Sequence, residues 1–128
     1  MRIGLTNIYV RDVAAAFQFY TEVLGFVEKI YVPDMQLAIV VSPEDRDGTA
    51  LLLEPNANPI AKAYQDALYQ AGLPPLVFVV KDIQTECERL QKLGVVFRQT
   101  PTKTDWGIQA LLEDTCGNLI QLHQANEV

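Results

Sequence analysis

The sequence has few of the residues that build disulfide frameworks or imidazole and thiolate metal sites. It holds two cysteines and one histidine in 128 residues. Cys87 lies in a helical pattern and Cys116 precedes a glycine in a turn, so they form no CxxC pair, and we expect reduced thiols. One histidine per chain is too few for a three-histidine zinc site or a two-histidine iron triad, even in a symmetric dimer with two sites.

Long apolar runs and clusters of positive charge are also missing. The longest apolar stretches, such as residues 73–80, fall far short of the roughly 20 residues of a membrane-spanning helix, and the chain opens on a strand-like pattern without a signal peptide. A net charge of −6 would repel nucleic acid and anionic membranes. We therefore expect a cytoplasmic protein whose partner is a small molecule or another protein chain.

Motifs for nucleotide binding and nucleophilic hydrolysis do not occur. The sequence contains no GxGxxG or GxxxxGK[ST] run and no Ser/His/Asp set. Its length, with 49% hydrophobic and 20% charged residues, is typical of one folded globular domain.

What the sequence does contain is an internal repeat. Residues 10–13 (VRDV) recur as residues 80–83 (VKDI), each time between an alternating apolar run and a segment with helical spacing. Asp12 and Asp82 stand at the position of a helix N-cap, and Gly25 and Gly94 follow the last turn of each helix. The chain is therefore two copies of one unit.

Each copy is predicted to be a strand, a helix and three strands. The first copy covers residues 3–10, 13–23, 26–32, 36–41 and 50–54, and the second covers 76–81, 83–93, 95–98, 107–113 and 119–123. An extra helix over 60–71, closed by Gly72, joins the copies. These elements predict a single α+β domain with module one at 1–56, a linker helix at 57–73 and module two at 74–128.

Three motifs in order carry a resemblance to a known family. They run from VRD to FYTEVLGF in residues 10–26, from FVVKDI to LGV in residues 78–95, and as EDTCGNL in residues 113–119. The chain resembles the vicinal-oxygen-chelate superfamily, which includes glyoxalase I, bleomycin-resistance proteins and extradiol dioxygenases. The resemblance implies two tandem βαβββ modules that form an open curved mixed sheet around a concave cavity, with helices on the convex side.

The resemblance also implies where metal-using members hold a divalent ion, with His, Gln or Glu ligands in the first and last strand of each module. The matching positions here are Leu5, Leu52, Pro75 and Gln121. Only Gln121 has a donor oxygen, whereas such ions need oxygen or nitrogen ligands. We therefore predict no metal and no other cofactor.

One shifted metal site stays open as an alternative. Strand alternation places Glu54 on the same face as Leu52, and His123 on the same face as Gln121, so Glu54, Gln121 and His123 are a possible three-ligand set. The other interpretation is that His123 is a rim or surface residue and that Glu54 only ends a strand.

The predicted cavity is mainly apolar with a few polar groups. Alternation turns Leu5 to the cavity together with Asn7 and Tyr9, and Val77 and Val79 lie at matching positions. Such a mixture is typical of a small-molecule site, and the ligand-binding candidates are Asn7, Tyr9, Glu54, Trp106, Gln121 and His123. Alternatively, the apolar residues pack a dimer seam or fill a collapsed cavity.

Trp106 lies in residues 104–107 (TDWG), which resemble a Trp-Gly motif found in part of this family. Two interpretations remain open for its ring. It either stacks on a flat ligand or packs in the core or a hinge.

The predicted function is metal-free binding of a small molecule, as in the bleomycin-resistance branch. One alternative is a glyoxalase-, epimerase- or lyase-like enzyme, with the shifted metal site or with Tyr9 and His123 as an acid–base pair. Another is an interaction module or subunit, since fold does not determine function. A homodimer is expected in each case, because the family commonly pairs its half-barrels and the sheet edges need cover.

Overall fold

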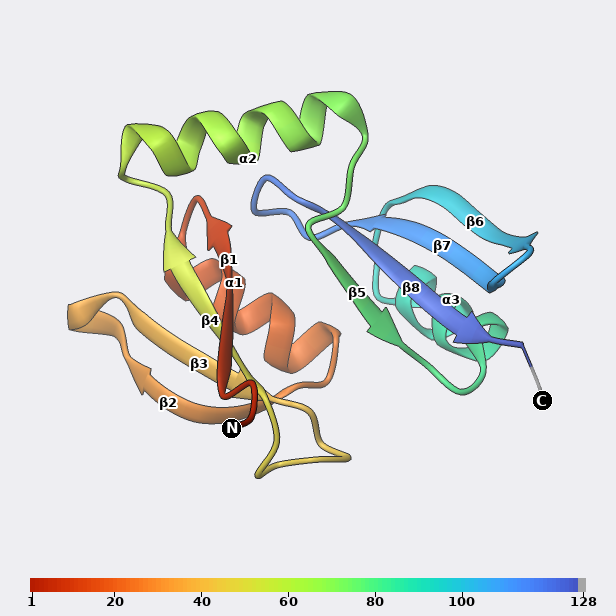
Figure 1. The fold of residues 1–128 in the computed structure, drawn as a ribbon, viewed down its shortest axis with the longest axis horizontal. Helices are drawn as coiled ribbons and strands as arrows, with labels where there is room; N and C mark the ends of the chain where they lie inside the picture. Colours follow the sequence, from red (N-terminus) through yellow and green to blue (C-terminus); the bar gives the residue numbers. More distant parts are fainter. Residues whose placement is uncertain (127–128) are drawn as a thin grey trace. The chain divides into compact units, whose positions relative to one another are not determined.

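The computed structural model describes residues 1–126. It divides into two compact units, an N-terminal unit of Met1–Ala67 with Thr115–Gly117, and a C-terminal unit of Leu68–Asp114 with the chain from Asn118 onward. Each unit contains one four-stranded mixed sheet, so the predicted α+β repeat of βαβββ modules is confirmed (Figure 1). The prediction of one domain with module boundaries at 56 and 74 stays a prediction.

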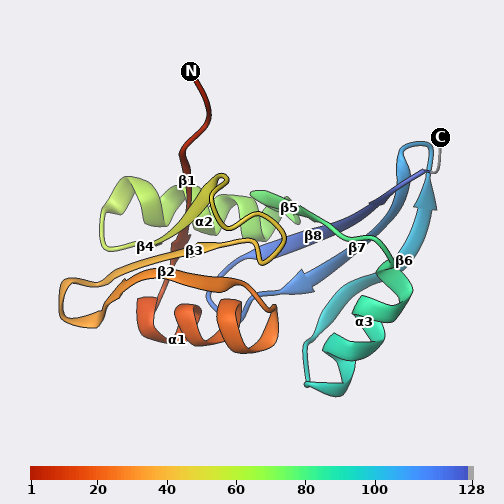
Figure 2. The same ribbon diagram turned by 90° about the horizontal axis from the view of Figure 1, so that it is seen from below.

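The sheet of the N-terminal unit has the strand order β1-β4-β3-β2. β1 pairs with β4 in parallel and the other pairs are antiparallel; the strands are β1 (Leu5–Val10), β2 (Val27–Val32), β3 (Leu37–Val41) and β4 (Ala50–Pro55). Helix α1 (Val13–Gln18) continues as the π-helical turn η1 (Phe19–Val23) and covers one face, and a 3-10 turn, η2 (Pro33–Met35), joins β2 to β3 (Figure 2). The core under α1 consists of Ile8, Val10, Val13, Ala16, Tyr20, Ala38, Val40, Leu51 and Leu53.

The sheet of the C-terminal unit repeats this topology as β5-β8-β7-β6. Its strands are β5 (Leu76–Val79), β6 (Phe97–Thr104), β7 (Gly107–Glu113) and β8 (Leu119–Ala125), and helix α3 (Ile83–Lys92) lies against one face. The core of this unit consists of Ile83, Cys87, Leu90, Ala110, Leu112, Ile120 and Leu122. In each unit the helix packs on one set of alternating side chains, so the other set lies on the opposite face, which we call the open face.

Element boundaries differ from prediction mainly at β6. This strand extends to Thr104, although only residues 95–98 were predicted. Pro101 hid the signal, because proline is compatible with a strand only at a sheet edge, and β6 is an edge strand. The predicted helix over 13–23 is α-helical only as far as Gln18. Within residues 1–126 no helix is long and apolar enough to cross a membrane.

The repeated aspartates are helix N-caps, as predicted. The Asp12 carboxylate accepts a hydrogen bond from the Ala15 backbone N–H at 3.1 Å, and Asp82 accepts one from the Thr85 N–H at 3.1 Å. The Thr85 hydroxyl adds a second bond to Asp82 at 2.9 Å. Gly25 and Gly94 have positive φ angles of 93° and 86°, a conformation that glycine adopts without strain after a helix.

Replacing Asp82 by alanine is expected to lower the melting temperature at pH 7, because the first turn of α3 loses its cap. The hydrogen bonds from the Thr85 backbone and side chain lower the pKa of Asp82 below its ordinary value of 3.8. The stabilisation is therefore complete above that value and is lost as the pH falls through the lower, folded-state pKa. Thermal melts from pH 7 to pH 2 should show the wild type and Asp82→Ala converging. Asp82→Asn retains a capping group, and equal melting curves for Asp82→Ala and Asp82→Asn at pH 7 would contradict this role.

Helix α2 (Pro59–Ala71) confirms the predicted linker helix. Gln65 is buried on it with 3% of its surface exposed. Its side-chain N–H groups donate to the backbone oxygens of Tyr9 at 2.9 Å and Cys116 at 3.0 Å, and its oxygen accepts from Asn56 at 2.7 Å. One buried amide therefore joins the helix to the end of β1, to the segment after β4 and to the 115–117 turn, all within the N-terminal unit.

Candidate functional site

The open face of the N-terminal sheet is largely apolar. Register places Asn7 beside Leu52, Leu52 beside Ile39 and Ile39 beside Ile30, so one row crosses all four strands. Several of these aliphatic side chains remain exposed to water, Leu5 by 51%, Ile30 by 40% and Val32 by 37%. We call this surface the apolar face; its aliphatic members are Leu5, Ile30, Val32, Leu37, Ile39 and Leu52.

The polar part of the apolar face is a carboxylate held by an amide. Asn7 Nδ2 donates to Glu54 Oε2 at 2.7 Å, and Glu54 is half-buried opposite Tyr9 in the β1–β4 ladder. Among residues 1–126 no cationic side chain forms an ion pair with Glu54. A carboxylate has two acceptor oxygens, and the hydrogen bond from Asn7 uses only Oε2.

Tyr9 is fixed by helix α2. Its ring meets the ring of Tyr64 edge to face, with centroids 6.4 Å apart, and its backbone oxygen receives the bond from Gln65. Aromatic pairs in this geometry add roughly 1 kcal/mol beyond area burial. Asn7, Tyr9 and Glu54 are thus three predicted site residues that the structure brings together on one face.

The open face of the C-terminal sheet carries several uncharged polar side chains. His123 pairs with Gln109 and Val79, and Gln121 pairs with Leu111 and Val77. On the edge strand, Thr102 is opposite Gln109 and Gln99 is opposite Leu111. We call the polar members of this face the polar row: Gln99, Thr102, Gln109, Gln121 and His123. Gln121 and His123 were predicted, and the others were not.

His123 has one nitrogen that the surrounding protein leaves unsatisfied. Its Nδ1 atom is buried and has no hydrogen-bond partner within the described part of the chain. The ring lies close to Gly107, where an added Cβ atom would come within 3.0 Å of His123 Cε1. A larger residue at position 107 would therefore displace the imidazole.

Trp106 lies at the turn between β6 and β7, and its surface is 80% exposed. The alternative that its ring packs in the core is wrong for this structure. Three hydrogen bonds order the turn. The Trp106 N–H donates to Thr104 Oγ1 at 3.2 Å, and this hydroxyl donates to the Gly107 oxygen at 3.0 Å. The Asn126 side chain donates to the Asp105 oxygen at 3.2 Å. An exposed indole is thus held on an ordered turn.

The donor atoms do not fit the divalent metal that some members of the family would hold. Leu5 and Leu52 carry aliphatic groups on the apolar face, and Pro75 precedes β5. Within residues 1–126 no three His, Cys, Asp or Glu side chains gather in a way that would hold a metal ion. Glu54 belongs to the N-terminal unit, whereas Gln121 and His123, the other members of the shifted set, belong to the C-terminal unit. The same division separates Tyr9 from His123, the pair considered for acid–base chemistry.

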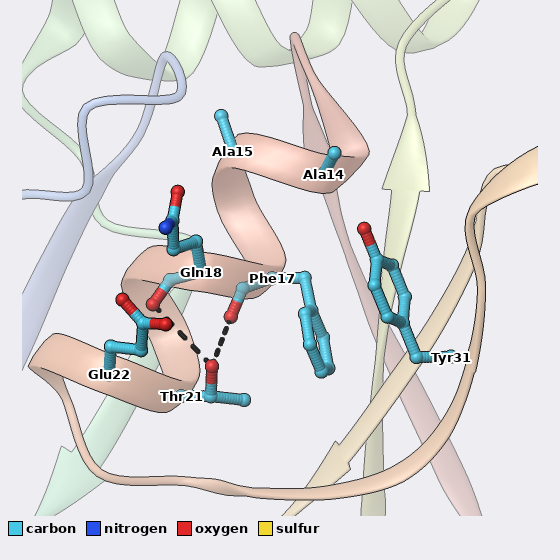
Figure 3. Close-up of a pocket in the computed structure, with 7 residues that line it drawn as sticks. All are labelled: Ala14, Ala15, Phe17, Gln18, Thr21, Glu22 and Tyr31. Atoms are coloured by element: carbon cyan, nitrogen blue, oxygen red, sulfur yellow. Dashed lines mark hydrogen bonds between the residues drawn. The ribbon is translucent and has the colours of Figure 1, made fainter.

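The helix side of the N-terminal unit carries a hollow of about 490 Å³ that was not predicted from the sequence (Figure 3). The Phe17 ring stacks on Tyr31 there, with centroids 3.9 Å apart, and Thr21 Oγ1 donates to the Phe17 oxygen at 2.7 Å. Tyr31 pairs with Ala38, which is buried under α1. The hollow is therefore on the face opposite Asn7, Tyr9 and Glu54.

Comparison with known proteins agrees with this architecture. A family model, the glyoxalase/bleomycin resistance protein/dioxygenase superfamily, matches residues 2–122, and the chain belongs to this superfamily. It is 49% identical over 126 residues to the uncharacterized protein YurT of Bacillus subtilis (strain 168), covering 97% of this chain and 99% of that protein. An uncharacterized protein of Shewanella frigidimarina is 32% identical over 94% of this chain and 90% of its own length.

Two solved structures are similar over nearly the whole chain. UcmS2 has a TM-score of 0.80 and 25% identity, covering 96% of this chain and 97% of its own. TnmS3, an antibiotic binding protein from Streptomyces sp. CB03234, has a TM-score of 0.75 and 27% identity, covering 98% of this chain and 97% of its own. These likenesses confirm the glyoxalase-like fold.

Proposed function

We propose that this protein binds a small, largely apolar molecule, such as an antibiotic, without a metal ion. The observation that carries the proposal is the apolar face, where exposed aliphatic side chains surround the Asn7–Glu54 pair. Ligand sites generally combine apolar walls with a few placed polar groups. The similarity to an antibiotic binding protein supports this reading.

The energetics of the apolar face favour a bound molecule over water. Each square ångström of apolar surface removed from water contributes about 25 cal/mol, so covering several half-exposed aliphatic side chains supplies a few kcal/mol. The Glu54 carboxylate then adds orientation, because it accepts a hydrogen bond from a ligand donor at a fixed place. The leucines at two of the four metal positions enlarge the apolar surface where other members would have ligands.

Thermal-shift screening of a library of antibiotics and metabolites, with chelator present, tests the proposal. A ligand at about 100 times its Kd stabilises the native state by about 2.7 kcal/mol, which raises the melting temperature measurably. A library that gives no stabilisation would overturn the proposal. A requirement for an added divalent metal would overturn its metal-free part.

The variant Ile30→Glu localises the binding. A charge on the apolar face is expected to weaken binding of a library hit by at least about tenfold, because the carboxylate loses hydration when the ligand covers it. Leu93→Glu is the matched control, since Leu93 is 55% exposed at the end of α3 and belongs to the C-terminal unit. Unchanged affinity of Ile30→Glu, or an equal loss in both variants, would show that the apolar face is not the binding surface.

A further inference from the structure

The polar row contains partly buried hydrogen-bonding groups: Thr102 donates to the Thr100 backbone oxygen at 2.8 Å, whereas His123 Nδ1 has no partner within residues 1–126. Gln109, Gln121 and His123 are half-buried on the open face of the C-terminal sheet. Polar groups that lose contact with water are usually paired, and a buried unpaired group costs about 1–3 kcal/mol. The Nδ1 atom of His123 is such a group within residues 1–126. Because the Nδ1 atom is itself buried, the groups that a bound molecule can reach are the half-buried amides of Gln109 and Gln121.

The chemistry of the polar row selects for a neutral ligand. Glutamine amides both donate and accept hydrogen bonds, and the row itself has no carboxylate, lysine or arginine. Arg98, on the same edge strand, is already bound, because its guanidinium donates to Glu113 at 2.7 Å and to the Tyr69 hydroxyl at 2.9 Å. Leu111 lies between Gln121 and Gln99, and Val77 and Val79 flank the row on the edge strand β5, so these side chains provide apolar contact.

Trp106 lies at one end of the two strands that carry Gln99, Thr102 and Gln109. Gln109 is three positions after Trp106 in the sequence, which is roughly 10 Å along an extended chain. Large aromatic side chains left exposed on ordered backbone are enriched among residues that dominate binding. An indole at this distance would cover one end of a flat ligand whose oxygens meet the polar row.

We infer that the polar row and Trp106 bind a neutral, flat ligand portion that carries several hydroxyl or carbonyl oxygens. The inference rests on the proposed function, since both concern a bound small molecule, and it concerns a surface of the C-terminal unit alone. The oxygens accept from the amides of Gln109 and Gln121, ligand hydroxyls donate to the amide oxygens, and Trp106 stacks on the flat surface. Such oxygens occur both on a sugar and on an oxygenated aromatic ring system.

The tryptophan gives a direct measurement, because the chain contains only one. The probes are genistein, its glucoside genistin, unsubstituted isoflavone and methyl glucoside, each titrated while indole emission is recorded. Genistein is expected to shift the emission to shorter wavelength and to bind at least about tenfold more tightly than isoflavone, since isoflavone lacks the hydroxyl groups. If genistin binds more tightly than genistein, the polar row binds the oxygens of the sugar. If genistein binds more tightly, the polar row binds the oxygens of the aromatic ring system.

Matched variants localise the effect. Gln109→Leu and Gln121→Leu are expected to remove the preference for genistein over isoflavone and to keep isoflavone binding, whereas Gln84→Leu, on the exposed side of α3, changes neither. Trp106→Phe should weaken all ring-containing probes, and isothermal titration calorimetry measures this loss because the variant contains no indole. Melting temperatures equal to that of the wild type show that a variant loses binding without unfolding.

Two outcomes would overturn the inference. One is the same probe affinities in the glutamine variants as in the wild type. The other is an unchanged indole emission with every probe. If library molecules still stabilise the protein and lose affinity in Ile30→Glu, the proposed function stands and only this inference fails. If no library molecule stabilises the protein, both the proposed function and this inference fail.

Discussion

Gln65→Leu is expected to lower the free energy of unfolding by about 3 kcal/mol. The side chain is buried, and its amide bonds the Tyr9 and Cys116 backbone oxygens and the Asn56 side chain. Leucine has a similar volume but no polar atoms, so the Tyr9 oxygen and the Asn56 amide lose a partner away from water. Each such loss contributes about 1–3 kcal/mol, and the added apolar burial offsets part of the sum.

Urea denaturation measures this change, and Gln84→Leu serves as its control. Gln84 is exposed on α3 and bonds only Glu88 on the same helix, so the same substitution there should change stability by less than about 0.5 kcal/mol. Equal effects at the two positions would contradict the role of Gln65. The Gln65 variant is also expected to lose proteolytic protection at the 115–117 turn, which Gln65 and the Arg11 backbone N–H hold through the Cys116 oxygen.

Gly107→Ala should destabilise the protein by a similar amount, about 3 kcal/mol, and should also disturb the candidate site. Gly107 has a φ of 147°, a conformation that side chains with a Cβ rarely adopt. A Cβ atom there would come within 2.1 Å of the Gln124 backbone oxygen and 3.0 Å of His123 Cε1. Because the first neighbour is backbone in the β7–β8 ladder, relief requires moving the strand.

Gly4→Ala is the matched control, since no atom lies within 4 Å of an added Cβ atom at Gly4. Thermal and urea unfolding of both variants should show a large loss for Gly107→Ala and little change for Gly4→Ala. The imidazole resonances of His123, the only histidine, should shift in Gly107→Ala. Wild-type stability with unshifted resonances would show that β7 and β8 separate easily at this end.

Local patterns predicted much of the fold. Capping by Asp12 and Asp82 and the positive φ of Gly25 and Gly94 depend on neighbouring residues alone, so they are visible in the sequence. The order strand, helix and three strands followed from the two periodicities. The extent of β6 was missed because pairing with β7, a non-local interaction, keeps Pro101 in an edge strand.

The candidate site was predicted only along single strands. Alternation within β1, β4 and β8 gave Asn7, Tyr9, Glu54, Gln121 and His123. Their neighbours on other strands depend on register, which sequence periodicity does not specify across β2, β3, β6 and β7. The aliphatic side chains next to Asn7 and the glutamines next to His123 were missed for this reason.

The sequence by itself determined the repeated unit, the caps and the side chains at the four metal positions, because each depends on residue identity or on spacing within a short segment. Only the tertiary structure decided that Gln65 is a buried link, that Trp106 is exposed on an ordered turn, and that the two open faces differ, one apolar around Glu54 and one polar around His123. These features arise from packing and strand register between segments far apart in the chain, and local sequence patterns contain no information about such pairings.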